Sequence, residues 1–155
     1  MSLHIIPFEN KYASNFKDLN IAWIKKYFHV ENKDVEILEN YEESIIKKGG
    51  VIFLAKYNNI IVGCFSFLKI NDFTYELGKM AVDENYQGKN IGQQLIQFSI
   101  TYAQKSKWDK IILYSSTKLT HALYLYKKYG FIEVELEKDL PYIRSDIKME
   151  LKLNI

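Results

Sequence analysis

A loop that carries two glycines, at residues 86–95, is the feature that most constrains how this chain folds. It follows an apolar, strand-like run at residues 77–82 and opens a helical pattern. Apolar residues in that pattern recur at spacings of four, three and four, at Ile91, Leu95, Phe98 and Tyr102. The first backbone N–H groups of a helix have no partner within the helix and lie at the positive end of its dipole. This strand–loop–helix unit therefore predicts a cradle for a phosphorylated ligand.

Size and composition favour one domain over residues 1–155. A chain of this length suits a single core, and 48% apolar with 26% charged residues is ordinary for a soluble globule. No apolar stretch approaches the roughly 20 residues that cross a bilayer. We therefore expect no membrane segment and no secretory signal. The single cysteine, Cys64, excludes an internal disulfide and favours a cytoplasmic location.

The charged and metal-binding residue types argue against two other classes of function. The net charge is +2, and the positive charges are 20 lysines and one arginine, Arg144. Arginine is the usual reader of bases and of paired phosphate oxygens, so we expect no nucleic-acid partner. The three histidines lack the spacing of metal ligands, so we expect no metal site. Cys64 lies between Gly63 and Phe65 on an expected strand, which favours a buried packing residue over a nucleophile.

Periodicity and turn residues predict alternating runs of strands and helices. Strands are expected at residues 3–7, 51–57, 60–70, 75–82, 110–115, 131–136 and 144–153. Helices are expected at residues 12–28, 34–48 and 120–129, with another that begins at Ile91. Gly78 within its strand predicts a bulge or the close approach of a ligand.

This order of elements predicts an α+β fold with a mixed, mainly antiparallel sheet flanked by helices on both faces. The strand–helix–strand unit at residues 75–115 places two parallel strands side by side, joined by a right-handed crossover. The remaining neighbours suit antiparallel hairpins. The strand at residues 144–153 alternates strictly between apolar and charged residues. We expect it to be half-buried at an edge of the sheet, where it is a candidate surface for a homodimer.

Three segments together resemble the GCN5-related N-acetyltransferases, which transfer an acetyl group from acetyl-coenzyme A to an amine. The family's phosphate loop reads Gln/Arg-x-x-Gly-x-Gly/Ala, and Gln87, Asn90 and Gly92 stand at its specified positions. Asn90 replaces the usual glycine, and asparagine is the other residue that best tolerates a positive φ. Residues 75–82 resemble the family's fourth strand, and residues 122–131 resemble its Ala-x-x-Leu-Tyr-x-x-x-Gly-Phe signature. The resemblance covers nearly the whole chain and implies the acyl-CoA N-acyltransferase fold.

The resemblance also implies that the cofactor is acetyl-CoA (coenzyme A), held on the glycine-bearing loop and between two diverging strands. Backbone N–H groups of the loop would hold its pyrophosphate, at Gln87, Gly88, Lys89, Asn90, Ile91, Gly92 and Gln93. Backbone groups of Met80, Ala81 and Val82 would lie along the pantetheine arm, and one N–H there would stabilise the oxyanion. The two strands would splay apart to admit the arm, with Ser116 and Thr117 near it. The family often has Asn at the position of Leu119, so one polar contact to the arm is missing here.

Two residues are candidates for proton transfer. Tyr126 matches the family's tyrosine, and a phenol of pKa about 10 keeps its proton at neutral pH, so it is the candidate general acid. Glu76 is the candidate general base, directly or through a water. It lies on the strand beside the cofactor and is expected to share one face with Gly78 and Met80. The plainer interpretations are a packing tyrosine and a solvated carboxylate.

The first two helices commonly line the acceptor site in this fold, so Trp23, Tyr27, Tyr41 and Glu43 are candidate acceptor contacts. The acceptor itself stays open among polyamines, aminoglycosides, amino acids, other small amines and protein amines. Arg144 either binds a substrate carboxylate or pairs with Glu133 or Asp146, and the ion pair is favoured. The alternative function is a non-catalytic acyl-CoA-binding sensor or interaction module, which the departures at Asn90 and Leu119 allow.

Overall fold

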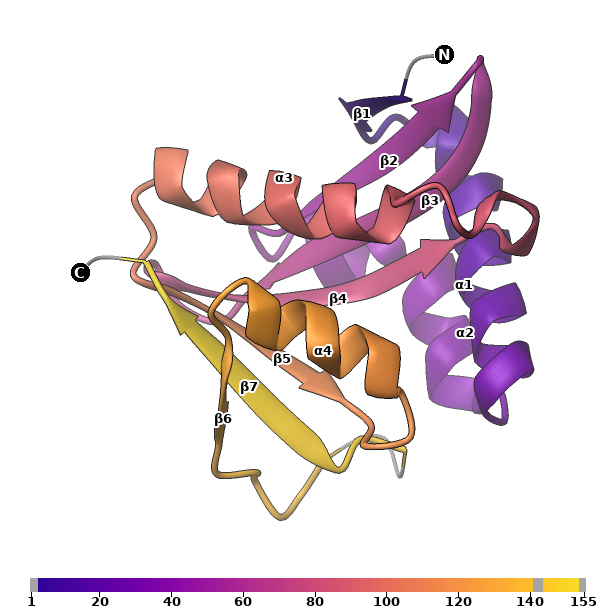
Figure 1. Ribbon diagram of the computed structural model, residues 1–155. Coiled ribbons are helices and arrows are strands. Elements are labelled where there is room, and N and C mark those ends of the chain that lie inside the picture. The colour runs from indigo at the N-terminus through magenta and orange to yellow at the C-terminus, as the bar shows by residue number, and fades with distance from the viewer. Residues whose placement is uncertain (1–2, 141–143, 154–155) are drawn as a thin grey trace.

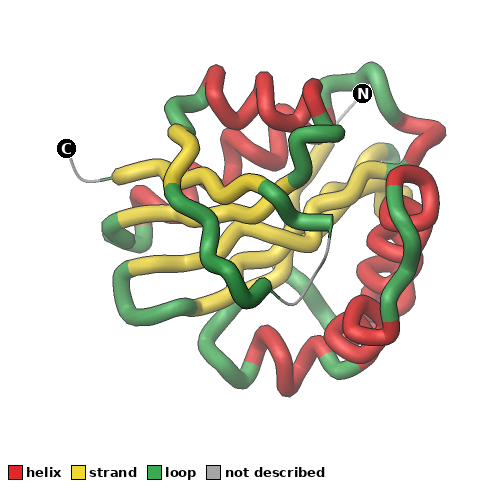
Figure 2. Tube along the Cα trace, turned by 90° about the horizontal axis from the view of Figure 1, so that it is seen from below, coloured by secondary structure: helices red, strands yellow, loops and turns green. Residues whose placement is uncertain are grey.

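The computed structural model of the protein describes residues 3–140 and 144–153, which form a seven-stranded sheet with helices on both faces (Figure 1, Figure 2). The strands are β1 (Leu3–Pro7), β2 (Val51–Tyr57), β3 (Ile60–Lys69), β4 (Thr74–Val82), β5 (Lys110–Ser115), β6 (Ile132–Val134) and β7 (Ile147–Lys152). The α-helices are α1 (Ala13–Tyr27), α2 (Asn32–Glu39), α3 (Ile91–Lys105) and α4 (Thr120–Lys128). Short helical turns are η1 (Asn10–Tyr12), η2 (Glu42–Ile46) and η3 (Glu84–Tyr86). The expected order and type of the elements are confirmed.

The helix expected at residues 34–48 is divided into two parts. α2 begins earlier than expected, because Asp34 accepts a hydrogen bond from the backbone N–H of Glu31 at 2.9 Å and so holds the first turn. It ends at Asn40, whose φ of −102° and ψ of 38° leave the helical region. The residues after it form the π-helical turn η2, where Ser44 Oγ donates to the Asn40 carbonyl at 2.8 Å.

The strand order in the sheet is β1-β2-β3-β4-β5-β7-β6. β4 and β5 are parallel, as the crossover through α3 predicts, and the other neighbours are antiparallel. The expectation that the strand at residues 144–153 forms a sheet edge is wrong. β7 lies between β5 and β6, with β6 paired to Lys148, Met149 and Glu150. The free sheet edge on which the expected homodimer was based is therefore not formed by β7.

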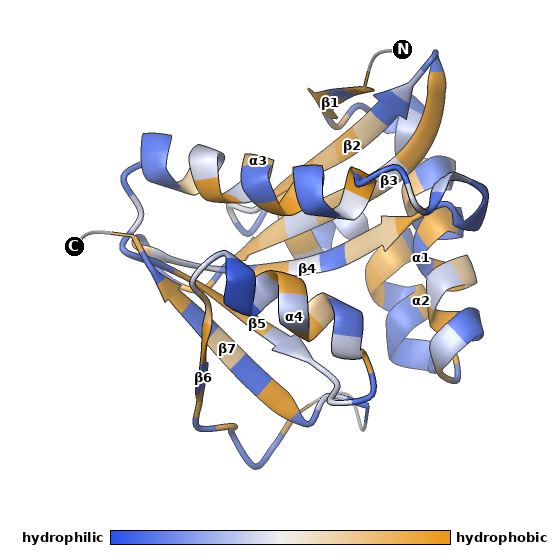
Figure 3. Ribbon diagram, in the orientation of Figure 1, coloured by the Kyte–Doolittle hydropathy of each residue, from blue (hydrophilic) through white to orange (hydrophobic). Residues whose placement is uncertain are grey.

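Each face of the sheet has its own apolar cluster. On one face, α3 and α4 pack over the larger cluster, which includes Phe65, Leu77, Leu95, Ile111 and Leu113. On the other face, α1 and α2 pack over a smaller cluster, which includes Phe16, Leu38, Leu54, Cys64 and Ala81. The apolar residues lie along the strands and along the sheet-facing sides of the helices (Figure 3). Over the described residues, none of the helices combines the length and the apolar character needed to span a bilayer.

Candidate active site

The glycine-bearing loop leads from β4 to α3 and leaves the start of that helix open. Asn90 stands at the N-cap with φ 61° and ψ 23°, which confirms that this asparagine takes the left-handed conformation its glycine-like position requires. Among the described residues no side chain caps α3, so the N–H groups of Ile91, Gly92 and Gln93 point out of the helix start. A Cβ on Gly88, whose φ is 84°, would meet no described atom within 4 Å. Donors and room for an anion therefore lie together here.

β4 and β5 separate soon after they begin, as Figure 1 shows. Their parallel pairing extends only from Thr74 with Lys110 to Glu76 with Ile112. Beyond that point β4 continues to Val82 and β5 to Ser115 without pairing to each other. The opening starts at residue 76 of β4, and the phosphate-type loop follows the same strand.

β4 carries a bulge inside this opening. Gly78 pairs with Ser66 and Ala81 pairs with Cys64, so β4 uses one more residue than β3 over the same length. The extra residue makes Lys79 adopt a φ of 53°, and the Cys64 thiol donates to its carbonyl at 3.3 Å. Burial raises the pKa of that thiol to about 12, as suits the expected packing role. The bulge that Gly78 predicts is thus confirmed.

The bulge corrects one expectation about the faces of β4. Met80 packs with the cluster under α3 and α4, whereas Ala81 belongs to the cluster under α1 and α2. Glu76 lies on the latter face, since its neighbours Tyr75 and Leu77 both point to the former. Glu76 and Met80 therefore do not share a face, because the extra residue reverses the alternation between them.

Glu76 is half-buried beside the bulge, at the point where β4 leaves β5. Its Oε2 atom lies 3.9 Å from the position that a Cβ would occupy on Gly78. Burial raises the pKa of Glu76; Lys79 and Lys148 oppose this shift, and the negative charge of Glu137 adds to it. A partly desolvated carboxylate of this kind is a better proton acceptor than a solvated one.

Tyr126 lies on the opposite face of the sheet from Glu76. α4 packs it against the larger cluster, and its ring centroid is 5.7 Å from that of Phe131. Burial raises the pKa of Tyr126 to about 12, so the phenol carries its proton at neutral pH. The two candidate proton-transfer groups therefore flank the sheet from its two faces.

The loop after β5 is hydrogen-bonded to the segment that precedes β7. The Thr117 N–H and hydroxyl both donate to the Asp146 carboxylate at 2.8 Å. These hydrogen bonds lower the pKa of Asp146. The Ser116 hydroxyl accepts from the Lys118 N–H at 3.2 Å, and Lys118 Nζ in turn donates to the Tyr27 carbonyl at 2.8 Å. Ser116 and Thr117 thus stand at the end of β5, and Lys118 joins their loop to the end of α1.

An ion pair of Arg144 with partners that the sequence did not indicate lies on the α1–α2 face. Arg144 Nη2 and Nη1 donate to the two carboxylate oxygens of Asp34 at 2.5 and 3.0 Å, and Nη1 also reaches Glu31 at 3.3 Å. The expected preference for an ion pair is confirmed, but the expected partners Glu133 and Asp146 are wrong. Asp34 is fully buried and is also close enough to Lys79 for their charges to interact. Nothing in the spacing of two ordinary charged residues 110 positions apart signals this contact.

The four candidate acceptor contacts are not brought together. Trp23 and Tyr27 lie one turn apart on α1, with ring centroids 5.4 Å apart. Tyr41 instead donates to Asn10 at 3.0 Å and packs edge-on against Phe8. Glu43 is exposed and pairs with Lys47 at 2.7 Å. Neither Tyr41 nor Glu43 shares a hydrogen bond, ion pair or ring contact with Glu76 or Tyr126 in the described chain.

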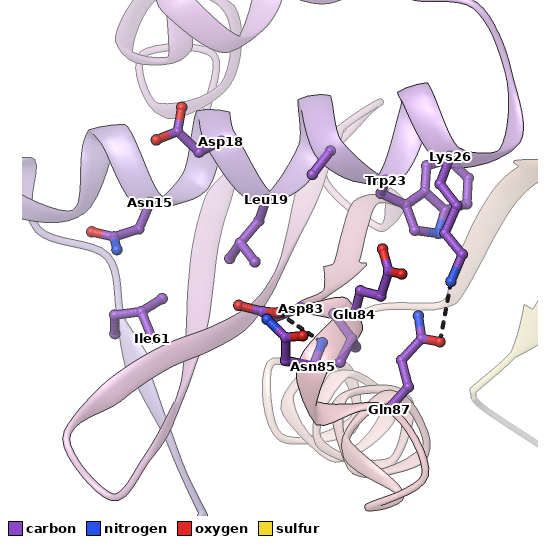
Figure 4. A pocket seen from close by; sticks show the side chains of 12 residues that line it. Asn15, Asp18, Leu19, Trp23, Lys26, Ile61, Asp83, Glu84, Asn85 and Gln87 are labelled. Atoms are coloured by element: carbon purple, nitrogen blue, oxygen red, sulfur yellow. Dashed lines mark hydrogen bonds between the residues drawn. The ribbon is translucent and has the colours of Figure 1, made fainter.

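A pocket of about 560 Å³ lies between α1 and the loop that follows β4 (Figure 4). Its apolar wall includes Leu19, Trp23 and Ile61, and Figure 4 shows the side chains of α1 facing those of the loop. Lys26 reaches Gln87 across one end, at 3.5 Å. Tyr126 and Glu76 do not line this pocket. It adjoins the glycine-bearing loop through Gln87, and Val82 at the end of β4 also lines it.

Two curated relatives match part of the chain. The uncharacterized N-acetyltransferase YvbK of Bacillus subtilis is 31% identical over 96 residues, which are 62% of this chain and 59% of the relative. N-alpha-acetyltransferase 30 of Saccharomyces cerevisiae is 32% identical over 59 residues, which are 38% of this chain and 34% of the relative. The matched segments thus span less than two thirds of either relative.

Solved structures match nearly the whole chain. A GNAT-family acetyltransferase of Staphylococcus aureus MU50 is 25% identical, with a TM-score of 0.86, over 99% of this chain and 100% of the other. A GNAT-family acetyltransferase of Elizabethkingia anophelis with acetyl-CoA bound is 26% identical, with a TM-score of 0.76, over 97% of this chain and 98% of the other. The expected fold is confirmed. The model of the acetyltransferase (GNAT) family matches residues 16–131, and the chain belongs to this family.

Proposed function

We propose that this protein transfers an acetyl group from acetyl-CoA to a primary amine, by direct attack while both substrates are bound. One observation carries the proposal: the open start of α3 follows the same strand, β4, that diverges from β5. A single molecule with a diphosphate and a long thiol arm would fit both features at once. The acetyl-CoA bound to the related structure from Elizabethkingia anophelis supports this choice of cofactor.

Backbone groups of the chain would hold the cofactor. The N–H groups of Ile91, Gly92 and Gln93 would bind the diphosphate, since among the described residues no side chain caps this helix and they stand at the positive end of α3. The edge of β4 from Met80 to Val82, which β5 leaves unpaired, would hydrogen-bond the arm. When bound, the cofactor supplies the acetyl group as an activated thioester.

The two proton transfers would take place on opposite faces of the sheet. An alkylammonium has a pKa of about 10.4 and cannot attack until it loses a proton. Glu76, on the α1–α2 face, would accept that proton, directly or through a water. Tyr126, on the α3–α4 face, would give its proton to the departing sulfur as the new amide forms. A backbone N–H of the bulged β4 segment would stabilise the developing oxyanion, an effect of about 3–4 kcal/mol in other acyl transfers.

The acceptor would be a small-molecule amine that enters from the α1–α2 face. A spermidine N-acetyltransferase from Vibrio cholerae, in complex with CoA and spermine, has this fold with a TM-score of 0.75 and 20% identity. That likeness concerns the fold alone. The choice of face rests on Glu76, because the amine must reach the group that takes its proton.

The experiment is a thiol-release assay with acetyl-CoA and a panel of primary amines, paired with calorimetry for acetyl-CoA and CoA. Release that depends on both the amine and the protein supports acetyl transfer. Tight binding with no amine-dependent release on any acceptor favours the alternative, a sensor or interaction module. Absence of any heat of association at millimolar concentrations overturns both.

A further inference from the structure

Backbone conformation or close packing requires glycine at five of the seven glycine positions. Gly49, Gly88 and Gly130 have positive φ. A Cβ on Gly50 would lie 2.4 Å from the Phe67 carbonyl oxygen, and one on Gly63 would lie 3.3 Å from that of Ala81. Neither reason applies to Gly78 or Gly92, whose φ values are not positive. At these two positions an added Cβ would meet no described atom closer than 3.9 Å and 4.0 Å, respectively.

Gly92 has an explanation in the proposed function, because it stands at the open start of α3 where a diphosphate would approach. Gly78 precedes the bulge, but the positive φ of the bulge falls on Lys79, so the bulge does not require glycine at position 78. Glycine within a strand costs stability relative to alanine, through the entropy of the unfolded chain. A strand glycine marks a bulge, a tight bend or a place where a ligand comes close to the backbone. Because neither conformation nor packing requires glycine at position 78, we consider the close approach of a ligand.

The residues around Gly78 indicate which part of a ligand would lie there. Within the described chain, the single atom beyond its immediate neighbours that comes within 4 Å of the missing Cβ is Glu76 Oε2. Gly78 and Glu76 are both half-buried, so solvent reaches them. The Gly78 carbonyl accepts a hydrogen bond from Ser66 Oγ at 3.2 Å, which fixes the backbone just before the bulge at Lys79. The open position therefore borders a carboxylate at the mouth of the β4–β5 opening.

We propose that Gly78 is a specificity-determining residue whose missing side chain makes room for the acceptor nitrogen and the carbon attached to it. This inference rests on the proposed function, since it assigns a place to the amine that Glu76 deprotonates. An amine with an unbranched CH₂ next to nitrogen would lie flat against the Gly78 backbone beside Glu76. A methyl group at position 78, or a branch next to the nitrogen, would compete for the same space.

The test is Gly78→Ala, with steady-state kinetics on linear and α-branched primary amines. The acceptor KM rises, and kcat/KM for the best linear amine falls by about tenfold or more, the usual effect of one misplaced methyl in a fitted site. The dissociation constant of acetyl-CoA changes less than twofold, because the cofactor segment of β4 begins at Met80. The melting temperature does not fall, because the backbone at residue 78 accepts alanine without strain.

Gly92→Ala is the matched control, since it adds the same methyl group at the other glycine that the structure does not require. It raises the KM of acetyl-CoA and leaves the acceptor KM unchanged. If Gly78→Ala turns over every amine as the wild type does, the role of Gly78 is wrong while acetyl transfer stands. If the wild type acetylates no amine, the proposed function fails first and this inference fails with it. If Gly78→Ala and Gly92→Ala both weaken acetyl-CoA binding equally and neither changes the acceptor KM, the role of Gly78 in acceptor specificity is also wrong.

Discussion

The guanidinium of Arg144 and the carboxylate of Asp34 form a two-point ion pair between the segment before β7 and the first turn of α2. β4 and β5, the strands that join the two halves of the sheet, pair over only three residues each. The ion pair therefore adds a second connection between the halves, on the face where Glu76 lies. Asp34 is fully buried and Arg144 is largely so, which makes the loss of one partner costly.

Asp34→Asn is expected to lower the free energy of unfolding by about 3 kcal/mol, because it removes the closer of the two carboxylates that, in the described chain, face the buried guanidinium and leaves Glu31, at 3.3 Å. Chemical denaturation at neutral pH measures this loss. Glu43→Gln is the control, since the Glu43–Lys47 pair is exposed and its removal should change stability little. Equal stability of Asp34→Asn and the wild type would contradict a structural role for the pair.

The same pair predicts how stability depends on pH. Burial alone would raise the pKa of Asp34, but hydrogen bonds from Arg144 and from the Glu31 N–H, together with the charge of Arg144, lower it. A carboxyl whose pKa is lower in the folded state stabilises the fold above its unfolded pKa of about 3.9. That contribution is lost as the pH falls through the folded value. The acid unfolding of Asp34→Asn is expected to be shallower than that of the wild type over this range.

Local sequence patterns predicted the glycine-bearing loop and the elements around it, because helix period, turn residues and the tolerance of Asn90 for positive φ are local properties. The Asp34–Arg144 pair was not predictable, since each residue alone resembles a surface charge. The alternation of apolar and charged residues at positions 144–153 predicted a half-buried strand, but such alternation carries no information about the order of strands in a sheet. Gly78 signalled the bulge, while the positive φ falls on Lys79, a residue type that seldom adopts it.

Tyr126→Phe is expected to lower kcat by about 100-fold while the affinity for acetyl-CoA stays the same, because the ring still packs but has no proton to give. Single-turnover kinetics and calorimetry measure the two quantities. Tyr124→Phe is the matched control on the same helix, since Tyr124 is 61% exposed and packs little. Unchanged turnover of Tyr126→Phe would rule out its role as the general acid.

Glu76→Gln is expected to lower kcat/KM for the amine by about 100-fold, with the largest loss at low pH, where the amine is hardest to deprotonate. The wild-type pKa of this carboxyl is raised by burial, so its ionised form costs stability at neutral pH. The variant should therefore be at least as stable as the wild type there. Glu133→Gln, at an exposed carboxyl on β6, is the control. A uniform loss at every pH would move the base to another group.

Gly92→Asp is expected to raise the dissociation constant of acetyl-CoA by at least about tenfold, because it sets a carboxylate against the diphosphate. The substitution should not unfold the helix, since a carboxylate in the first turn of α3 is favourable to the helix dipole. Gly92→Asn adds a side chain of the same size without the charge, so the difference between the two variants isolates electrostatics. That difference should shrink as salt increases, since both groups are near solvent. Equal affinity of Gly92→Asp and the wild type at low salt would show that the phosphates bind elsewhere, and the start of α3 would then need another ligand.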